Sequence, residues 1–121
     1  MKGSFPLSNE EIDKQVDKNR MGNYAIGYTK DGNFHTTYVG RSDTDVNARL
    51  KKHVGKHGNS KRFRYDYASS VTAAFERECE NYHKYKGSLT NDMHPDQPDE
   101  HGKTIYCPVS SCEKSKPKDK Q

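Results

Sequence analysis

An Asp-Gly turn between two strand-like segments constrains the fold of this chain more than any other feature. Residues 24–28 and residues 34–39 contain mainly aromatic, β-branched and small side chains, and Lys30-Asp31-Gly32-Asn33 separates them. Asp-Gly favours a tight hairpin turn because both residues tolerate a positive φ, and the flanking residue types favour strands. The sequence therefore predicts an antiparallel hairpin, and a fold built around a sheet.

A short helix is predicted before the hairpin. Ser8 and Glu11 have the spacing of a capping box, which begins a helix that we expect to extend to about Asn19. Residues 1–7 carry no helix or strand pattern and are expected to be an irregular lead-in. Residues 1–20 are therefore interpreted as an accessory N-terminal helical segment.

Two helices and one strand are predicted after the hairpin. After a cap at residue 42 or 43, an apolar side chain at every fourth position indicates a helix that contains Val46 and Leu50. Residues 62–67 alternate charged with aromatic side chains, which is typical of a half-buried strand. A longer helix is expected from residue 69 or 70, and its face is apolar except for Glu78. The predicted fold class is α+β, with a small three-stranded antiparallel sheet flanked by helices.

The composition indicates one small domain with a basic surface. Of the 121 residues 29% are hydrophobic, the mean hydropathy is -1.27 and the net charge is +4, which favours polyanionic partners. We expect residues 21–92 to form the core domain, residues 93–112 a loop-rich C-terminal extension and residues 113–121 a disordered Lys-rich tail. The chain carries neither a membrane-spanning apolar run nor a signal-peptide pattern, so we expect a cytoplasmic protein without a membrane partner.

Side chains suited to phosphodiester hydrolysis are expected to converge beside the hairpin. Tyr24 and Tyr38 lie in the paired strands, and Arg49 and His53 are one helical turn apart on the next helix. Glu78 occupies an otherwise apolar helix face, where a carboxylate costs desolvation free energy unless it meets a cation. Together these groups could take a proton from water and hold a phosphate.

Each of these residues also has an ordinary structural interpretation. The two tyrosines could be strand aromatics that pack the sheet, and the arginine and the histidine could be solvated surface residues. The glutamate is distinguished from its neighbours Glu76 and Glu80 by helical spacing, which directs those two outward. The functional interpretation depends on all five residues occurring together.

In order and spacing these residues resemble the GIY-YIG nuclease domain, a family that includes certain homing endonucleases, restriction enzymes and the incision subunit of excision repair. Gly22-Asn23-Tyr24 stands at the place of the GIY triplet and Tyr38-Val39-Gly40 at that of YIG, and the resemblance covers residues 22–91. Two departures occur. Asn23 replaces the usual aliphatic residue, and Arg49 lies one residue further from Gly40 than in the family.

The resemblance implies a divalent-metal-dependent endonuclease that acts on DNA, with DNA repair among the implied roles. It implies Mg²⁺ or Mn²⁺ at Glu78, Tyr24 as general base on water, and Tyr38 as an orienting or sharing partner. Arg49 would stabilise the phosphoryl oxygens, and His53 would hold the nucleophile or the tyrosine proton. Arg49, Arg41 or the metal would favour the phenolate of the tyrosine. The supporting residues implied are Gly22, Gly40, Arg41 and Asn91.

A second metal site is predicted from the cysteines. Cys79 and His83 are four residues apart on one helix, and Cys107 and Cys112 follow in the loop-rich extension. These four residues could bind a structural Zn²⁺ that joins the extension to the helix, with His94 as a replacement ligand. The alternative is that Cys79 packs in the core and the two later cysteines are thiols.

A basic stretch beside the predicted site is the candidate nucleic-acid surface. Its members are Lys51, Lys52, Lys56, His57, Lys61, Arg62 and Arg64. Such a surface contacts phosphates without reading sequence, and a solvated charged loop is the alternative. Two other functions stay open for the chain: a catalytically inactive nucleic-acid-binding module of the same fold, and a zinc-stabilised protein-interaction domain.

Overall fold

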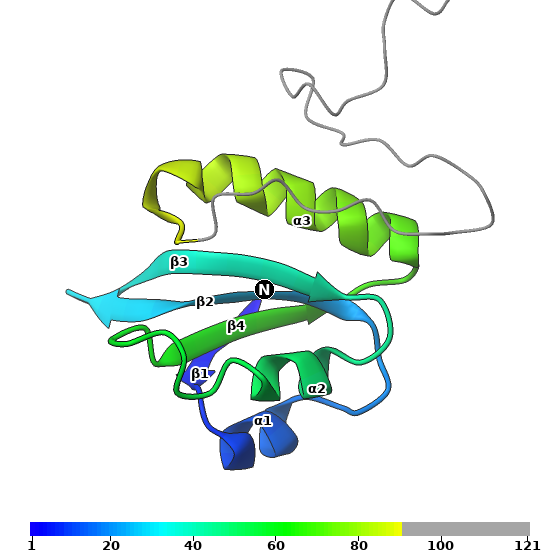
Figure 1. Cartoon of the computed structure of the whole chain (residues 1–121), viewed down its shortest axis with the longest axis horizontal. Helices are drawn as coiled ribbons and strands as arrows, with labels where there is room; N and C mark the ends of the chain where they lie inside the picture. The colour runs from blue at the N-terminus through cyan, green and yellow to red at the C-terminus, as the bar shows by residue number, and fades with distance from the viewer. Residues whose placement is uncertain (91–121) are drawn as a thin grey trace, which may run out of the picture.

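The computed structural model describes residues 1–90 of the chain. Along the chain the elements are β1 (Lys2–Pro6), α1 (Asn9–Gln15), β2 (Gly22–Lys30), β3 (Asn33–Ser42), α2 (Val46–Lys51), β4 (Arg62–Tyr67), α3 (Val71–Tyr85) and a 3₁₀ turn (Lys86–Ser88). The four strands form one antiparallel sheet in the order β1-β4-β2-β3. Figure 1 shows α3 on one face of this sheet and α1 and α2 on the other. The predicted α+β class is confirmed.

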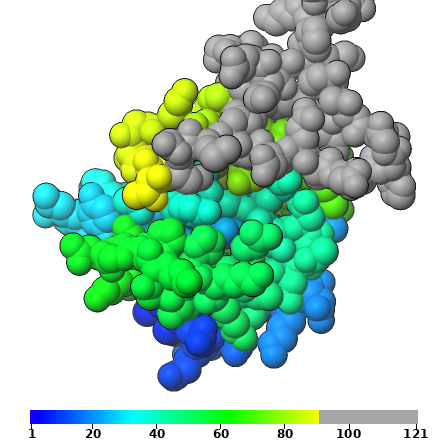
Figure 2. Space-filling model, in the orientation of Figure 1, coloured from blue at the N-terminus to red at the C-terminus, as the bar shows by residue number. Residues whose placement is uncertain are grey.

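The predicted hairpin is confirmed as the β2–β3 pair. Asp31 and Gly32 adopt φ values of 53° and 78° in the turn, the positive values that the Asp-Gly pair was expected to supply. Tyr24 lies opposite Gly40, and a bulge follows Ile26. In Figure 2 the hairpin tip (cyan) projects at the left, and the segment after α2 (green) lies in front.

The predicted strand count was wrong, because residues 1–7 are not an irregular lead-in. β1 pairs antiparallel with β4 and makes the sheet four-stranded. Arg62 of β4 stabilises this pairing, since its side chain donates hydrogen bonds to both Oγ and the carbonyl oxygen of Ser4 at 2.8 Å. Phe5 packs its ring against Phe63 at a centroid distance of 5.6 Å. The pairing partner, rather than any pattern within the five residues, determines this strand.

The first helix is shorter than predicted. Ser8 caps it as expected, accepting a hydrogen bond from the N–H of Glu11. The helix ends at Gln15 instead of near Asn19, because Val16 leaves the helix in an extended conformation and is buried in the core. Asn47 of α2 then donates a hydrogen bond to the carbonyl oxygen of Val16 at 2.8 Å, which ties α1 to α2.

Helix α2 begins later than predicted. Its N-cap is Asp45, whose carboxylate accepts a hydrogen bond from the N–H of Ala48. Ser42 caps the preceding turn instead, accepting from the N–H groups of Thr44 and Asp45. Helix α3 begins after the N-cap Ser70, as predicted.

Apolar side chains pack on both faces of the sheet. The larger cluster lies under α1 and α2 and contains Ile12, Val16, Tyr24, Ile26, Val46, Leu50, Phe63 and Tyr65. A smaller cluster of Ala25, Val39 and Tyr82 lies between the sheet and α3. The sheet therefore lies between two helical layers. Within residues 1–90 no helix is both long enough and apolar enough to cross a membrane.

Candidate active site

Tyr24 occupies the central strand β2 and is only 1% exposed. Its ring lies over Gly40, so that a Cβ at Gly40 would come within 2.4 Å of the tyrosine oxygen. Gly22 is restricted in the same way by β4, because a Cβ there would lie 2.2 Å from the carbonyl oxygen of Asp66. Both glycines of the two triplets are thus required by close approach.

Tyr24 and Tyr38 converge on His53, which follows α2. The Tyr24 hydroxyl and His53 Nε2 are hydrogen-bonded at 2.8 Å. The ring of Tyr38 lies 6.3 Å from that of Tyr24 and 4.8 Å from that of His53. The predicted convergence of the two tyrosines and the histidine is therefore present.

His57 is also a member of this cluster, although the sequence interpretation assigned it to the basic stretch. His53 Nδ1 and His57 Nε2 are hydrogen-bonded at 2.8 Å, and the ring of Tyr38 lies 4.9 Å from that of His57. The spacing of four residues between two histidines is the signal in the sequence that could have identified it. Tyr24, His53 and His57 thus form a continuous hydrogen-bonded chain.

Glu78 enters the site from α3, on the opposite side of the sheet. It is 9% exposed, whereas Glu80 on the same helix is exposed and Glu76 is partly buried. Its Oε1 accepts a hydrogen bond from Arg41 Nη1, and Arg41 Nε donates to Asp43 at 2.9 Å. The cation that a buried carboxylate requires is therefore supplied by Arg41, a residue expected only to support the site.

Asn23, the departure from the family pattern, connects the strand to α3. Its side chain is 2% exposed and donates a hydrogen bond to the carbonyl oxygen of Ala74 at 2.8 Å. An aliphatic side chain could not make this bond. Asn23 therefore fixes α3, and with it Glu78, relative to the strand that carries Tyr24.

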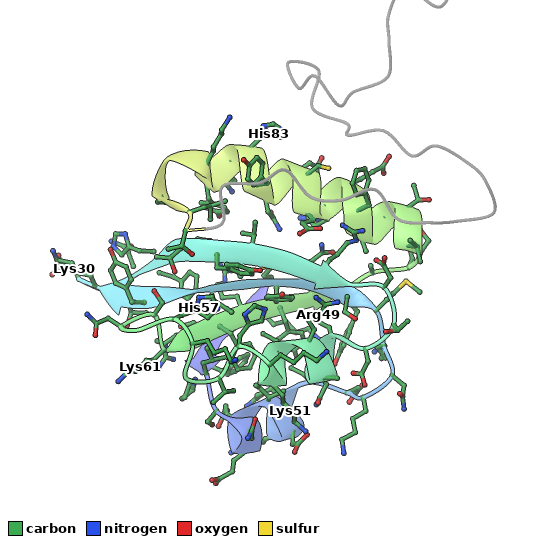
Figure 3. The ribbon with its side chains drawn as sticks, viewed as in Figure 1. Lys30, Arg49, Lys51, His57, Lys61 and His83 are labelled. Atoms are coloured by element: carbon green, nitrogen blue, oxygen red, sulfur yellow. The ribbon has the colours of Figure 1, made fainter. Side chains whose placement is uncertain are left out.

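Arg49 lies on the exposed side of α2 and acts on the cluster through its charge. Figure 3 shows its side chain projecting from α2 toward the sheet, on the same side as His57. Burial raises the pKa values of Tyr24, Tyr38 and Glu78, and the positive charge of Arg49 opposes each of these increases. The guanidinium is therefore close enough to both tyrosines and the glutamate to act on them electrostatically.

Burial governs the protonation of the cluster. It raises the pKa of Tyr24 above its ordinary value, and the charges of Tyr38 and Glu78 raise it further, so that the opposing effect of Arg49 is outweighed. Burial, together with the charges of His57, Arg49 and Lys56, lowers the pKa of His53 to about 4. Burial also raises the pKa of Glu78, against the effect of Arg41. At neutral pH Tyr24 is a phenol and His53 a neutral imidazole.

The predicted zinc ligands fall only in part within the described residues. Cys79 is fully buried on the inner face of α3, and His83 is partly exposed, with its ring 5.3 Å from that of Tyr82. Cys107, Cys112 and the supporting residue Asn91 lie outside residues 1–90. Among residues 1–90 no group of three or more His, Cys, Asp or Glu side chains is placed to hold a metal ion.

The predicted basic stretch is divided between several surfaces. Lys51 pairs with Asp13 of α1 at 2.6 Å, and Figure 3 shows it directed away from Lys61. Arg62 is bonded to β1, as described above, and Arg64 donates to the carbonyl oxygen of Met1 at 2.8 Å. The exposed lysines beside the His53–His57 segment are Lys52, Lys56 and Lys61. The exposed basic side chains of residues 49–61 are therefore these three lysines and Arg49.

No known protein-family model, curated protein or solved structure matches the chain. The resemblance to the GIY-YIG domain therefore stays a prediction from the residues themselves.

Proposed function

We propose that the chain is a divalent-metal-dependent endonuclease that hydrolyses DNA phosphodiester bonds. The observation that carries the proposal is the convergence of a hydrogen-bonded tyrosine–histidine pair, an exposed arginine and a buried glutamate at the edge strand of one sheet. The four residues come from separate parts of the chain. Tyr24 lies on β2 and His53 in the turn after α2, whereas Arg49 lies on α2 and Glu78 on α3. Ordinary packing does not require these four side chains to lie together.

The tyrosine–histidine pair supplies the base. Water that attacks a phosphorus atom must lose a proton, and a tyrosine can accept that proton only if its own proton has left. Tyr24 is protonated at neutral pH because it is buried, but its hydroxyl is hydrogen-bonded to the neutral ring of His53. The hydrogen bond gives the phenolic proton an acceptor at His53 Nε2, and the positive charge of Arg49 favours the phenolate while Tyr24 activates water. Tyr38, packed on both residues, would orient that water.

The two arginines have different roles. Arg41 is held by both Asp43 and Glu78, so it fixes the carboxylate rather than binding substrate. Arg49 is exposed and acts electrostatically on both tyrosines, so its guanidinium can bind the phosphoryl oxygens on which charge develops during hydrolysis.

Glu78 is the residue that would hold the metal ion. Mg²⁺ is bound in many phosphoryl-transfer sites by one or two carboxylates, with waters and substrate phosphate as the other ligands. A single buried carboxylate close to an exposed arginine fits this requirement. When bound, Mg²⁺ or Mn²⁺ would neutralise charge on the phosphate and on the leaving oxygen.

Cleavage of plasmid DNA with Mg²⁺, with Mn²⁺ and with a chelator tests the proposal. We expect metal-dependent cleavage that Glu78→Gln, Arg49→Ala and Tyr24→Phe each reduce by at least about 100-fold. Glu80→Gln is the matched control, because Glu80 is exposed on the same helix. Parallel assays with RNA establish the nucleic acid that is cleaved.

Two results would replace the proposal with another function. DNA binding that weakens with salt, without cleavage under any metal, would identify an inactive nucleic-acid-binding module. The absence of both binding and cleavage, with zinc found by elemental analysis, would identify a zinc-stabilised interaction domain.

A further inference from the structure

We propose that His57 is a positioning residue that fixes the tautomer of His53 and conducts the proton of Tyr24 to solvent. The inference rests on the proposed nuclease function for its catalytic part. It goes beyond that function because it assigns a task to a side chain that does not touch the substrate.

The hydrogen bonds determine the tautomer. If the Tyr24 hydroxyl donates to His53 Nε2, that nitrogen carries no hydrogen, so the neutral ring must carry its hydrogen on Nδ1. The Nδ1–H then donates to His57 Nε2 at 2.8 Å, and neutral His57 keeps its own hydrogen on Nδ1. Without an acceptor at that place, His53 loses the partner that selects the tautomer able to accept from Tyr24.

The chain conformation after α2 brings the two histidine rings into contact, with an angle of 40° between their planes. Gly55 and Gly58 adopt φ values of 78° and 55°, which favour glycine, and they turn the segment so that the rings lie 4.9 Å apart. The N–H of Ser60 donates to the carbonyl oxygen of His57 and closes the turn. His57 is the outer member of the chain, because His53 lies between it and the buried Tyr24.

The proton can therefore move outward in one balanced sequence. The O–H bond of Tyr24 breaks as an N–H bond forms at His53 Nε2, and the Nδ1–H bond of His53 breaks as one forms at His57 Nε2. His57, now an imidazolium, releases its Nδ1 proton to solvent. The products are a phenolate at Tyr24 and two neutral imidazoles, each with its hydrogen on Nε2.

The surrounding charges favour such a transfer over storage of the proton on His53. Burial and the charges of His57, Arg49 and Lys56 all oppose a positive charge on His53, whereas His57 is opposed by burial alone. The charged and titratable groups that act on the relay from the packed elements are Tyr38 of β3, Arg49 of α2, Lys56 of the following turn and Glu78 of α3. A proton that arrives at His53 is therefore driven to the outer ring.

Two substitutions separate positioning from proton transfer. His57→Ala removes both the acceptor that positions His53 and the group that carries the proton onward. In the His57→Gln variant the side-chain oxygen can still accept a hydrogen bond from His53 Nδ1, but it cannot carry a proton onward. Nitrogen-15 NMR of the histidine rings in the full chain reports the tautomer of His53. We expect the Nδ1–H form in the wild type and in His57→Gln, and a mixture of tautomers in His57→Ala.

Kinetics on plasmid DNA provides the second measurement. We expect kcat to fall about 10–100-fold in both variants with KM nearly unchanged, a shifted pH profile, and partial restoration of the alanine variant by added imidazole. Exposed His35→Ala is the control, expected to match the wild type in both measurements.

The outcomes distinguish failure of the inference from failure of the proposed function. An unchanged His53 tautomer in His57→Ala overturns the positioning role, whether or not the protein cleaves DNA. Full kcat in His57→Gln overturns the proton-transfer role. If the wild type cleaves no nucleic acid, the proposed function fails and the catalytic part of the inference fails with it, while the NMR result still decides the positioning part.

Discussion

Acidification from about pH 7.5 to about pH 4.5 is expected to destabilise the protein through His53. The unfolded ring binds a proton below its ordinary pKa of 6.5, whereas the folded ring does so only below about 4, because burial and the charges of His57, Arg49 and Lys56 oppose the imidazolium. Between these values the unfolded state binds more protons, so the contribution of His53 to stability is present above 6.5 and is lost as the pH falls toward 4.

The size of this effect follows from the pKa difference. One pKa unit corresponds to about 1.4 kcal/mol, which gives an upper limit of about 3 kcal/mol. His53 is only partly buried, and solvent screening reduces the expected value to about 1–2 kcal/mol.

Urea denaturation at both pH values measures the effect in the wild type, in His53→Gln and in His35→Gln. The carboxylates titrate in all three proteins, so their contribution cancels in the comparison. The wild type and the His35 variant should lose about 1–2 kcal/mol more than the His53 variant. Equal losses in all three proteins would show that His53 is not held neutral by its surroundings, and the Tyr24–His53 hydrogen bond would lose its assigned direction.

Three further predictions concern the framework of the site. Arg41→Ala should cost about 2–4 kcal/mol in urea denaturation, since it leaves Glu78 buried without its cation, and adding Glu78→Gln should recover part of the loss; no recovery would contradict the pairing. Gly40→Ala should cost about 1–3 kcal/mol and abolish cleavage by displacing Tyr24, and wild-type cleavage would refute the close approach. Phe5→Ala should cost about 1–3 kcal/mol, and an unchanged denaturation midpoint would mean that β1 is not docked.

Local chemistry made the centre of the fold predictable. The Asp-Gly turn, the strand-favouring segments around it and the N-cap Ser70 act within a few residues of themselves, so the β2–β3 hairpin and α3 follow from the sequence. The position of Glu78 was predictable for the same reason, because helical spacing alone placed it on the buried face.

Features that depend on a distant partner were not predictable. Residues 2–6 form a strand only because β4 offers them an unpaired edge, and Arg62, assigned to a nucleic-acid surface, is used to hold that edge. Arg41 was expected to assist the tyrosines, but the sequence does not reveal that β3 brings it beside Glu78. Spacing along the chain does not determine which distant residue a basic side chain will contact.

The two triplets acquire a physical reason once the strands are paired. Because Gly40 has no side chain, the ring of Tyr24 can lie across β3 and extend its hydroxyl to His53. Gly22 permits the close approach of β4, and Asn23 binds α3 to the same strand. Three consecutive residues of β2 thus contact β4, α3 and His53 in turn. The glycines and the asparagine set the geometry, and the tyrosine is the residue for which that geometry is needed.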